Sequence, residues 1–238
     1  MGADYHYSKI YIGKESPELA KERIVDRLHN KLIKEDFAEI QEEILSNWSY
    51  LLIDDADSWL HFGEWGKNKV MEEFPLYLSA DYPIIHINVS DSAAVRFTLY
   101  EKGQLVDQYA NMDFPFFMFK SKEVADQYSG QIAYWEQFLA LPNSGKLLQE
   151  TWAYPATVGI QKTNNKKFHP LMTDTIKLFG WDKSLSEIGY TYNEEGLPES
   201  GIEYLFRYHK SKYTFLQKHY QYQGKDNPFQ TIKDYLDS

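Results

Sequence analysis

Residues 84–109, IIHINVSDSAAVRFTLYEKGQLVDQY, constrain the fold more than any other stretch of this chain. Side chains alternate between the two faces of a β-strand, so Ile85, Ile87 and Val89 can line one face of a sheet. The alternation resumes after residue 94, and residues 101–103 (EKG) supply a tight turn whose glycine can adopt a positive φ. The stretch therefore predicts consecutive β-strands that pair as hairpins.

Apolar spacing elsewhere predicts a mixture of further strands and helices. Ser16 can cap a helix that has Pro17 at its first position, because the missing N–H of proline needs no partner there. Helical spacing continues past residue 34, which indicates one bent helix or two consecutive helices up to residue 44. The other expected elements are strands at 5–12, 48–53, 188–192 and 202–208, a loop at 57–66, helices at 67–79, 122–139, 146–152 and 168–179, and two short helices in the tail at 210–238.

These elements do not follow a regular β-α alternation, which favours an α+β fold over a doubly wound sheet. We expect a mixed or antiparallel sheet with a central hairpin meander, packed by amphipathic helices, and a smaller C-terminal α+β region. The polar segment before Phe168 is the best candidate linker. It suggests a main domain at residues 1–158 and a C-terminal region at 159–238, although a single continuous domain is an alternative.

Charge and composition narrow the classes of function. The chain has 238 residues and a formal net charge of −10, which disfavours binding to nucleic acids and to anionic membranes and attracts a basic protein. It contains no cysteine, which excludes disulfides, thiolate catalysis and cysteine-ligated zinc. The sequence shows no signal peptide and no apolar run long enough to span a membrane, so we expect a cytoplasmic, soluble protein.

The sequence contains none of the common catalytic motifs. Neither a G-x-S-x-G nucleophile motif nor a G-x-x-x-x-G-K-[ST] or G-x-G-x-x-G phosphate-binding loop occurs. We therefore expect no organic cofactor.

One acidic cluster is a candidate metal site. Asp54, Asp55 and Asp57 follow the apolar stretch 48–53, and Asp91 follows another expected strand. Carboxylate oxygens are the ligands that Mg²⁺ prefers, so these four residues could hold that ion if the two strand ends met. The alternative is that they are solvated carboxylates at the ends of strands.

His61 and Glu64 form a second candidate pair. They would share a face if the segment were helical, as in some metal sites. Gly63 and Gly66 indicate a loop instead.

Aromatic residues are frequent, at 16% of the chain, and 19 of them are tyrosines. Trp59, Trp65, Phe116 and Phe117 are the candidate binding residues, because exposed aromatic clusters mark partner surfaces. The alternative is that they pack in the core. Tyrosines of the C-terminal third could likewise form a recognition face or stack across strands.

The leading hypothesis is a non-catalytic protein that binds another macromolecule through an acidic, aromatic surface. Its sharpest version is a bacterial immunity- or antitoxin-like partner of a basic toxin. The alternative is a metal-dependent hydrolase or transferase that uses the acidic cluster with Mg²⁺, and a third hypothesis is small-molecule binding without catalysis. The sequence leaves the oligomeric state open.

Overall fold

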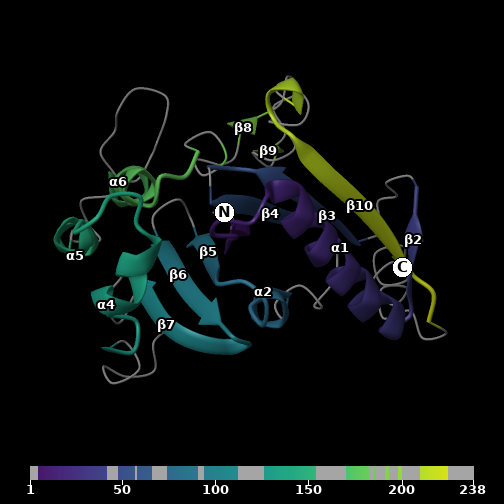
Figure 1. The fold of residues 1–238 in the computed structure, drawn as a ribbon, viewed down its shortest axis with the longest axis horizontal. Coiled ribbons are helices and arrows are strands. Elements are labelled where there is room, and N and C mark those ends of the chain that lie inside the picture. The colour runs from purple at the N-terminus through teal and green to yellow at the C-terminus, as the bar shows by residue number, and fades with distance from the viewer. Residues whose placement is uncertain are drawn as a thin grey trace, which may run out of the picture.

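A computed structural model describes residues 5–41, 48–56, 58–65, 74–90, 94–111, 126–153, 170–182, 185, 191–192, 198–199 and 210–224 of the chain. These residues form an α+β fold built on one eight-stranded antiparallel sheet (Figure 1). The strand order is β2-β10-β3-β4-β1-β5-β6-β7, so neighbours in the sheet often come from distant parts of the sequence. The helices within the described residues include none that is both long and apolar enough to cross a membrane.

The strands of the main sheet are β1 (Tyr5–Tyr11), β2 (Phe37–Ile40), β3 (Trp48–Asp54), β4 (Trp59–Trp65), β5 (Ile84–Ser90), β6 (Ala94–Glu101), β7 (Gln104–Ala110) and β10 (Phe215–Tyr222). A separate two-stranded sheet pairs β8 (Thr191–Tyr192) with β9 (Pro198–Glu199). The helices are α1 (Pro17–Lys34), α2 (Phe74–Leu78), α4 (Ile132–Trp135), α5 (Gly145–Trp152) and α6 (Pro170–Phe179). Short 3₁₀ helices occur at η2 (Glu136–Phe138) and η4 (Lys210–Lys212).

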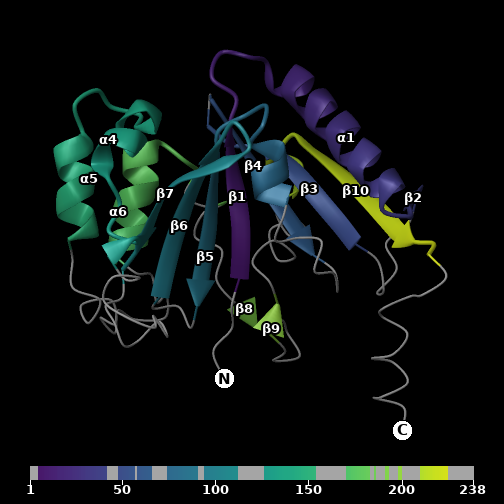
Figure 2. The same ribbon diagram turned by 90° about the horizontal axis from the view of Figure 1, so that it is seen from below.

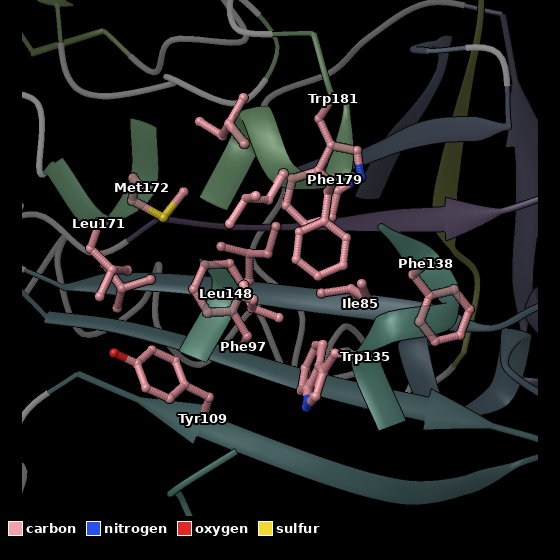
Figure 3. Packing of buried hydrophobic residues seen from close by; sticks show 14 of the residues in the cluster. Ile85, Phe97, Tyr109, Trp135, Phe138, Leu148, Leu171, Met172, Phe179 and Trp181 are labelled. Carbon is pink, nitrogen blue, oxygen red and sulfur yellow. The ribbon is translucent and has the colours of Figure 1, made fainter. Parts of the chain in front are cut away.

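Helices cover the two faces of the sheet separately (Figure 2). On one face, Ile10 of β1 packs in a cluster with Ile24 and Leu28 of α1. On the other face, Phe97 of β6 packs in a second cluster with Trp152 of α5, among residues from α4 and α6 (Figure 3). Because side chains alternate along each strand, the same sheet contributes side chains to both clusters.

Several sequence-based predictions are confirmed. Strands occupy the expected stretches near 5–12 and 48–53, and α5 and α6 lie where helices were expected at 146–152 and 168–179, with α6 described from Pro170. Ser16 caps α1 by accepting a hydrogen bond from the Leu19 amide at 3.3 Å, with Pro17 at the start of the helix. Gly180 follows α6 with a φ of 71°, which is the left-handed conformation expected at a helix C-terminus.

Three predictions are wrong. Residues 37–40 form strand β2 rather than a continuing helix, because Asp36 has a φ of 63° and turns the chain out of α1. Residues 59–65 form strand β4 rather than a loop. Residues 215–222 form strand β10 rather than a helix in the tail. Of the expected helices at 67–79 and 122–139, the described residues contain only the short α2, α4 and η2, and the expected strand at 202–208 lies outside the described residues.

Strand β10 lies between β2 and β3 in the main sheet. A strand from beyond residue 159 is thus hydrogen-bonded on both sides to strands from the first 54 residues. The domain boundary near residue 159 stays a prediction. A C-terminal region that begins there contributes strand β10 to the main sheet.

The packing of Gly130 provides a test of the second cluster. Gly130 has a φ of 70°, and a Cβ atom added there would lie 2.7 Å from Cζ3 of Trp152 and 3.1 Å from Cβ of Tyr109. We expect Gly130→Ala to lower the free energy of unfolding by about 2–4 kcal/mol, because it combines left-handed backbone strain with overpacking. Urea denaturation measures this change. Gly13→Ala is the matched control, since its φ is 62° but its nearest neighbour would lie at 3.9 Å. Equal losses in the two variants would contradict the packing described for Trp152.

Candidate protein-binding face

The outer surface of α1 carries a row of unpaired acidic side chains. Glu18, Glu22 and Asp26 are four residues apart and exposed, so they lie along one line of the helix. None of them has an ion-pair partner within the part of the chain that the structure describes. We call these three residues the acidic row.

The basic residues of α1 point to other partners. Lys21 pairs with Asp54 of β3, with 2.7 Å between Nζ and Oδ1. Arg23 pairs with Glu15 at 3.0 Å, and Arg27 pairs with Asp81 at 2.8 Å. These pairs neutralise the nearby positive charges, so the acidic row keeps its own charge uncompensated.

An open groove runs beside the acidic row, between α1 and the end of α2. It has a volume of about 710 Å³, and Asp26, Asn30, Tyr77 and Tyr82 are among the residues that line it. The Tyr82 hydroxyl donates a hydrogen bond to Glu15 at 2.7 Å. Burial, together with this acidic neighbour and against the effect of Arg23, raises the pKa of Tyr82 to about 12. The groove thus places two tyrosine rings and the carboxylate of Asp26 beside Arg23 and Arg27, whose charges are paired with Glu15 and Asp81.

The acidic cluster expected to hold a metal divides between different partners. Asp54 pairs with Lys21 of α1. Asp55 instead pairs with Lys9 of β1. Asp57 and Asp91 lie outside the described residues, and within those residues no group of three His, Asp or Glu side chains comes together in a way that could hold a metal ion.

Lys9 and Asp55 form a fully buried ion pair. The Lys9 Nζ atom lies 2.6 Å from Oδ2 of Asp55, and both side chains are 0% exposed. The other carboxylate oxygen of Asp55 accepts a hydrogen bond from the Asp182 amide at 2.6 Å. Burial lowers the pKa of Lys9, although Asp55 opposes the shift. Nothing in the sequence near Lys9 marked it as buried, because its partner lies 46 residues away.

His61 and Glu64 point to opposite faces of the sheet, because β4 is a strand and the two residues are three positions apart. His61 is buried and stacks on Tyr7 with 5.0 Å between ring centroids, and neither ring nitrogen has a hydrogen-bond partner among the described residues. Burial, assisted by Lys9, lowers the pKa of His61 well below its usual value. The hypothesis that His61 and Glu64 share a site is therefore wrong.

Glu64 lies on the face of the sheet that packs against α1 and α2. Burial raises its pKa to about 8, while the indole of Trp48 acts in the opposite direction. The Nε2 atom of His6 lies 3.7 Å from Oε1 of Glu64.

The candidate aromatic residues lie in different environments. Trp59 is 4% exposed and packs edge-on against Trp181 at 5.5 Å, so it belongs to the core rather than the surface. Trp65 is the last residue of β4, and its side chain is not described. Phe116 and Phe117 lie outside the described residues.

Two serine–histidine pairs across strands were not expected from the sequence. Ser8 lies opposite His86 with 3.0 Å between Oγ and Nδ1, and Ser49 lies opposite His219 at 2.7 Å. Only the strand register reveals them. Burial, together with His6 and Arg96, lowers the pKa of His86 to about 3, which makes it a poor base at neutral pH. Both serines are buried, so these pairs stabilise the sheet and do not form a nucleophilic site.

Comparisons with known proteins give no further assignment: no family model, no curated protein and no solved structure matches this chain.

Proposed function

We propose that this protein binds a basic protein partner through the acidic row and the adjoining groove, without catalysing a reaction. The observation that carries the proposal is the set of three exposed acids on α1, which have no ion-pair partner in the described part of the chain, beside a groove lined in part by Tyr77 and Tyr82. An immunity- or antitoxin-like role toward a basic toxin is the sharpest form of the proposal.

Electrostatic attraction and contacts with tyrosine rings are the physical basis of the proposed binding. A net charge of −10 attracts a basic protein over long range, and uncompensated acids on one helix orient its approach. Tyrosines suit the centre of such a contact because they bury a large rigid ring and keep a polar tip. Leu19, which is 43% exposed beside the acidic row, adds apolar area.

The buried titratable groups support a binding role over catalysis at neutral pH. Lys9 and Asp55 are fully buried, and His61 has no exposed surface. A reacting substrate would need direct access to such groups. The acidic residues that remain exposed on α1 lie where a partner could reach them.

Reversing the charge of the acidic row tests the proposal. The variant Glu18→Lys/Glu22→Lys/Asp26→Lys, used as bait in affinity capture from the native cell, should lose a basic protein that the unmodified chain recovers in stoichiometric amount. We expect a loss of affinity of at least about 100-fold, because like charges then face each other across the interface. Recovery by the unmodified bait should weaken as the salt concentration rises.

The matched control is Asp126→Lys/Glu150→Lys/Asp174→Lys. It changes the net charge equally, and Glu150 and Asp174 lie on α5 and α6, which cover the opposite face of the sheet. This control should retain the partner. If both triple variants lose it equally, the net charge and not the acidic row is responsible. If neither loses it, the proposed face is wrong.

The metal-dependent alternative receives no specific support from the described residues. Each of the two described members of the acidic cluster, Asp54 and Asp55, is paired with a lysine.

A further inference from the structure

We propose that Lys9 and Asp55 become joined by an intramolecular isopeptide bond between Nζ of Lys9 and Cγ of Asp55. Such a bond would connect β1 covalently to the residue that follows β3, across the intervening strand β4. The inference rests on the buried geometry of this pair and does not depend on the proposed binding function.

The pair is already held in a reactive arrangement. Nζ lies 2.6 Å from Oδ2, and Oδ2 is bonded directly to the carbon atom that the amine would attack. Strand pairing fixes the backbone of Lys9, and the Asp55 amide donates a hydrogen bond to the Trp59 carbonyl at 3.1 Å, so the reaction needs no further loss of translational or rotational freedom. Both side chains are 0% exposed, which keeps bulk water from the amine and from the product amide.

The surroundings favour the reactive form of the amine. The rings of Tyr7 and Trp181 lie 5.5 and 5.6 Å from Nζ, measured to their centroids, so the amine is in an aromatic environment. Burial lowers the pKa of Lys9, although Asp55 and Asp182 oppose the shift, and this favours the neutral amine that acts as the nucleophile. In the proposed reaction the amine passes one proton to Oδ2 before it adds to Cγ.

The Asp182 amide is placed to assist the addition step. It donates a hydrogen bond at 2.6 Å to Oδ1, the carboxyl oxygen that does not contact Lys9. When the amine adds to Cγ, negative charge develops on this oxygen, and a fixed N–H donor stabilises it. In the product Oδ1 is the amide carbonyl oxygen and can keep the same hydrogen bond.

The atoms and electrons balance without an oxidant or a metal. The nitrogen lone pair forms the N–Cγ bond, and the Cγ–Oδ2 bond breaks with its electron pair on oxygen. After the first proton transfer the nitrogen gives up a second proton and Oδ2 gains it, so one water molecule leaves. Nζ and Oδ2 lie 2.6 Å apart, so both protons can pass directly between them.

The chain contains an internal comparison for this reaction. Lys21 and Asp54 are also in close contact, at 2.7 Å, but the Asp54 side chain is 25% exposed. Water can reach and solvate this second pair, so it should remain an ordinary ion pair. If the bond forms at Lys9 and not at Lys21, the burial of the pair accounts for the difference, because the N–O distances of the two pairs are nearly equal.

The intact mass of the purified, full-length protein tests the proposal. We expect a mass one water molecule lower than the sequence requires, and a branched peptide containing Lys9 and Asp55 after proteolysis. Lys9→Arg should restore the full mass. An unmodified protein that has the full sequence mass and yields only linear peptides would overturn the proposal, as would a loss of water located at any other residue.

Discussion

Replacing Lys9 with methionine should lower the free energy of unfolding by about 3–5 kcal/mol, because it leaves the buried Asp55 carboxylate without its partner. Methionine has a similar shape, so packing against Tyr7 and Trp181 changes little. The loss is expected whether the native contact is an ion pair or an amide. Chemical denaturation of the variant and the unmodified protein at pH 7 measures it.

A second variant separates charge from packing. Lys9→Met/Asp55→Asn removes both charges and retains a carbonyl oxygen that can accept the Asp182 amide hydrogen bond. We expect this double variant to be more stable than Lys9→Met alone, because no uncompensated charge remains buried. If the double variant is less stable than Lys9→Met, the buried pair described here does not account for the stability.

Glu64→Gln should stabilise the protein at alkaline pH and have little effect at acidic pH. The pKa of Glu64 is about 8 in the folded protein against an ordinary value of 4.5. Between these two values the folded state holds the proton more tightly than the unfolded state does, so the contribution of Glu64 to stability is present below pH 4.5 and is lost as the pH rises to about 8. Glutamine never ionises, and the gain over the unmodified protein at pH 9 should be about 3–5 kcal/mol.

Thermal or chemical unfolding at pH 5 and pH 9 measures this gain. Glu150→Gln is the control, because it removes a carboxylate that is 59% exposed on α5. The control should show no comparable difference between the two pH values. A Glu64→Gln effect that is the same at pH 5 and pH 9 would contradict the burial of Glu64 as an un-ionised acid.

The sequence predicted local structure well where strong periodicity or a clear cap was present. Strand β3 is a compact, mostly apolar run, and α1 has a serine cap followed by proline, so the strand and the start of the helix were predicted correctly. Strand β4 was mistaken for a loop because Gly63 breaks its apolar pattern. Pairing with β3, where Leu51 lies opposite Gly63, holds β4 in the sheet, and the local sequence does not reveal this pairing. Strand β10 reads FLQKHYQY, a polar sequence whose apolar face appears only when it pairs with β3.

The candidate site was harder to predict, because its features depend on contacts between distant residues. The acidic row lies on a correctly predicted helix, but its lack of partners becomes clear only when Lys21, Arg23 and Arg27 are seen to pair elsewhere. Lys9 belongs to the strand predicted at 5–12, and its burial depends on Trp181 and Asp55. Asp55 was singled out as a possible metal ligand, and the structure shows that its immediate partner is an amine.

The proposed binding face is tested most directly by hydrogen–deuterium exchange on the protein alone and in complex with the basic partner recovered by affinity capture. Slower exchange in the complex should be confined to α1 and to residues 74–82, which include α2 and the tyrosines of the groove. The α5 and α6 helices on the opposite face should exchange at unchanged rates. Protection confined to α5 and α6, or no change at α1, would contradict the account.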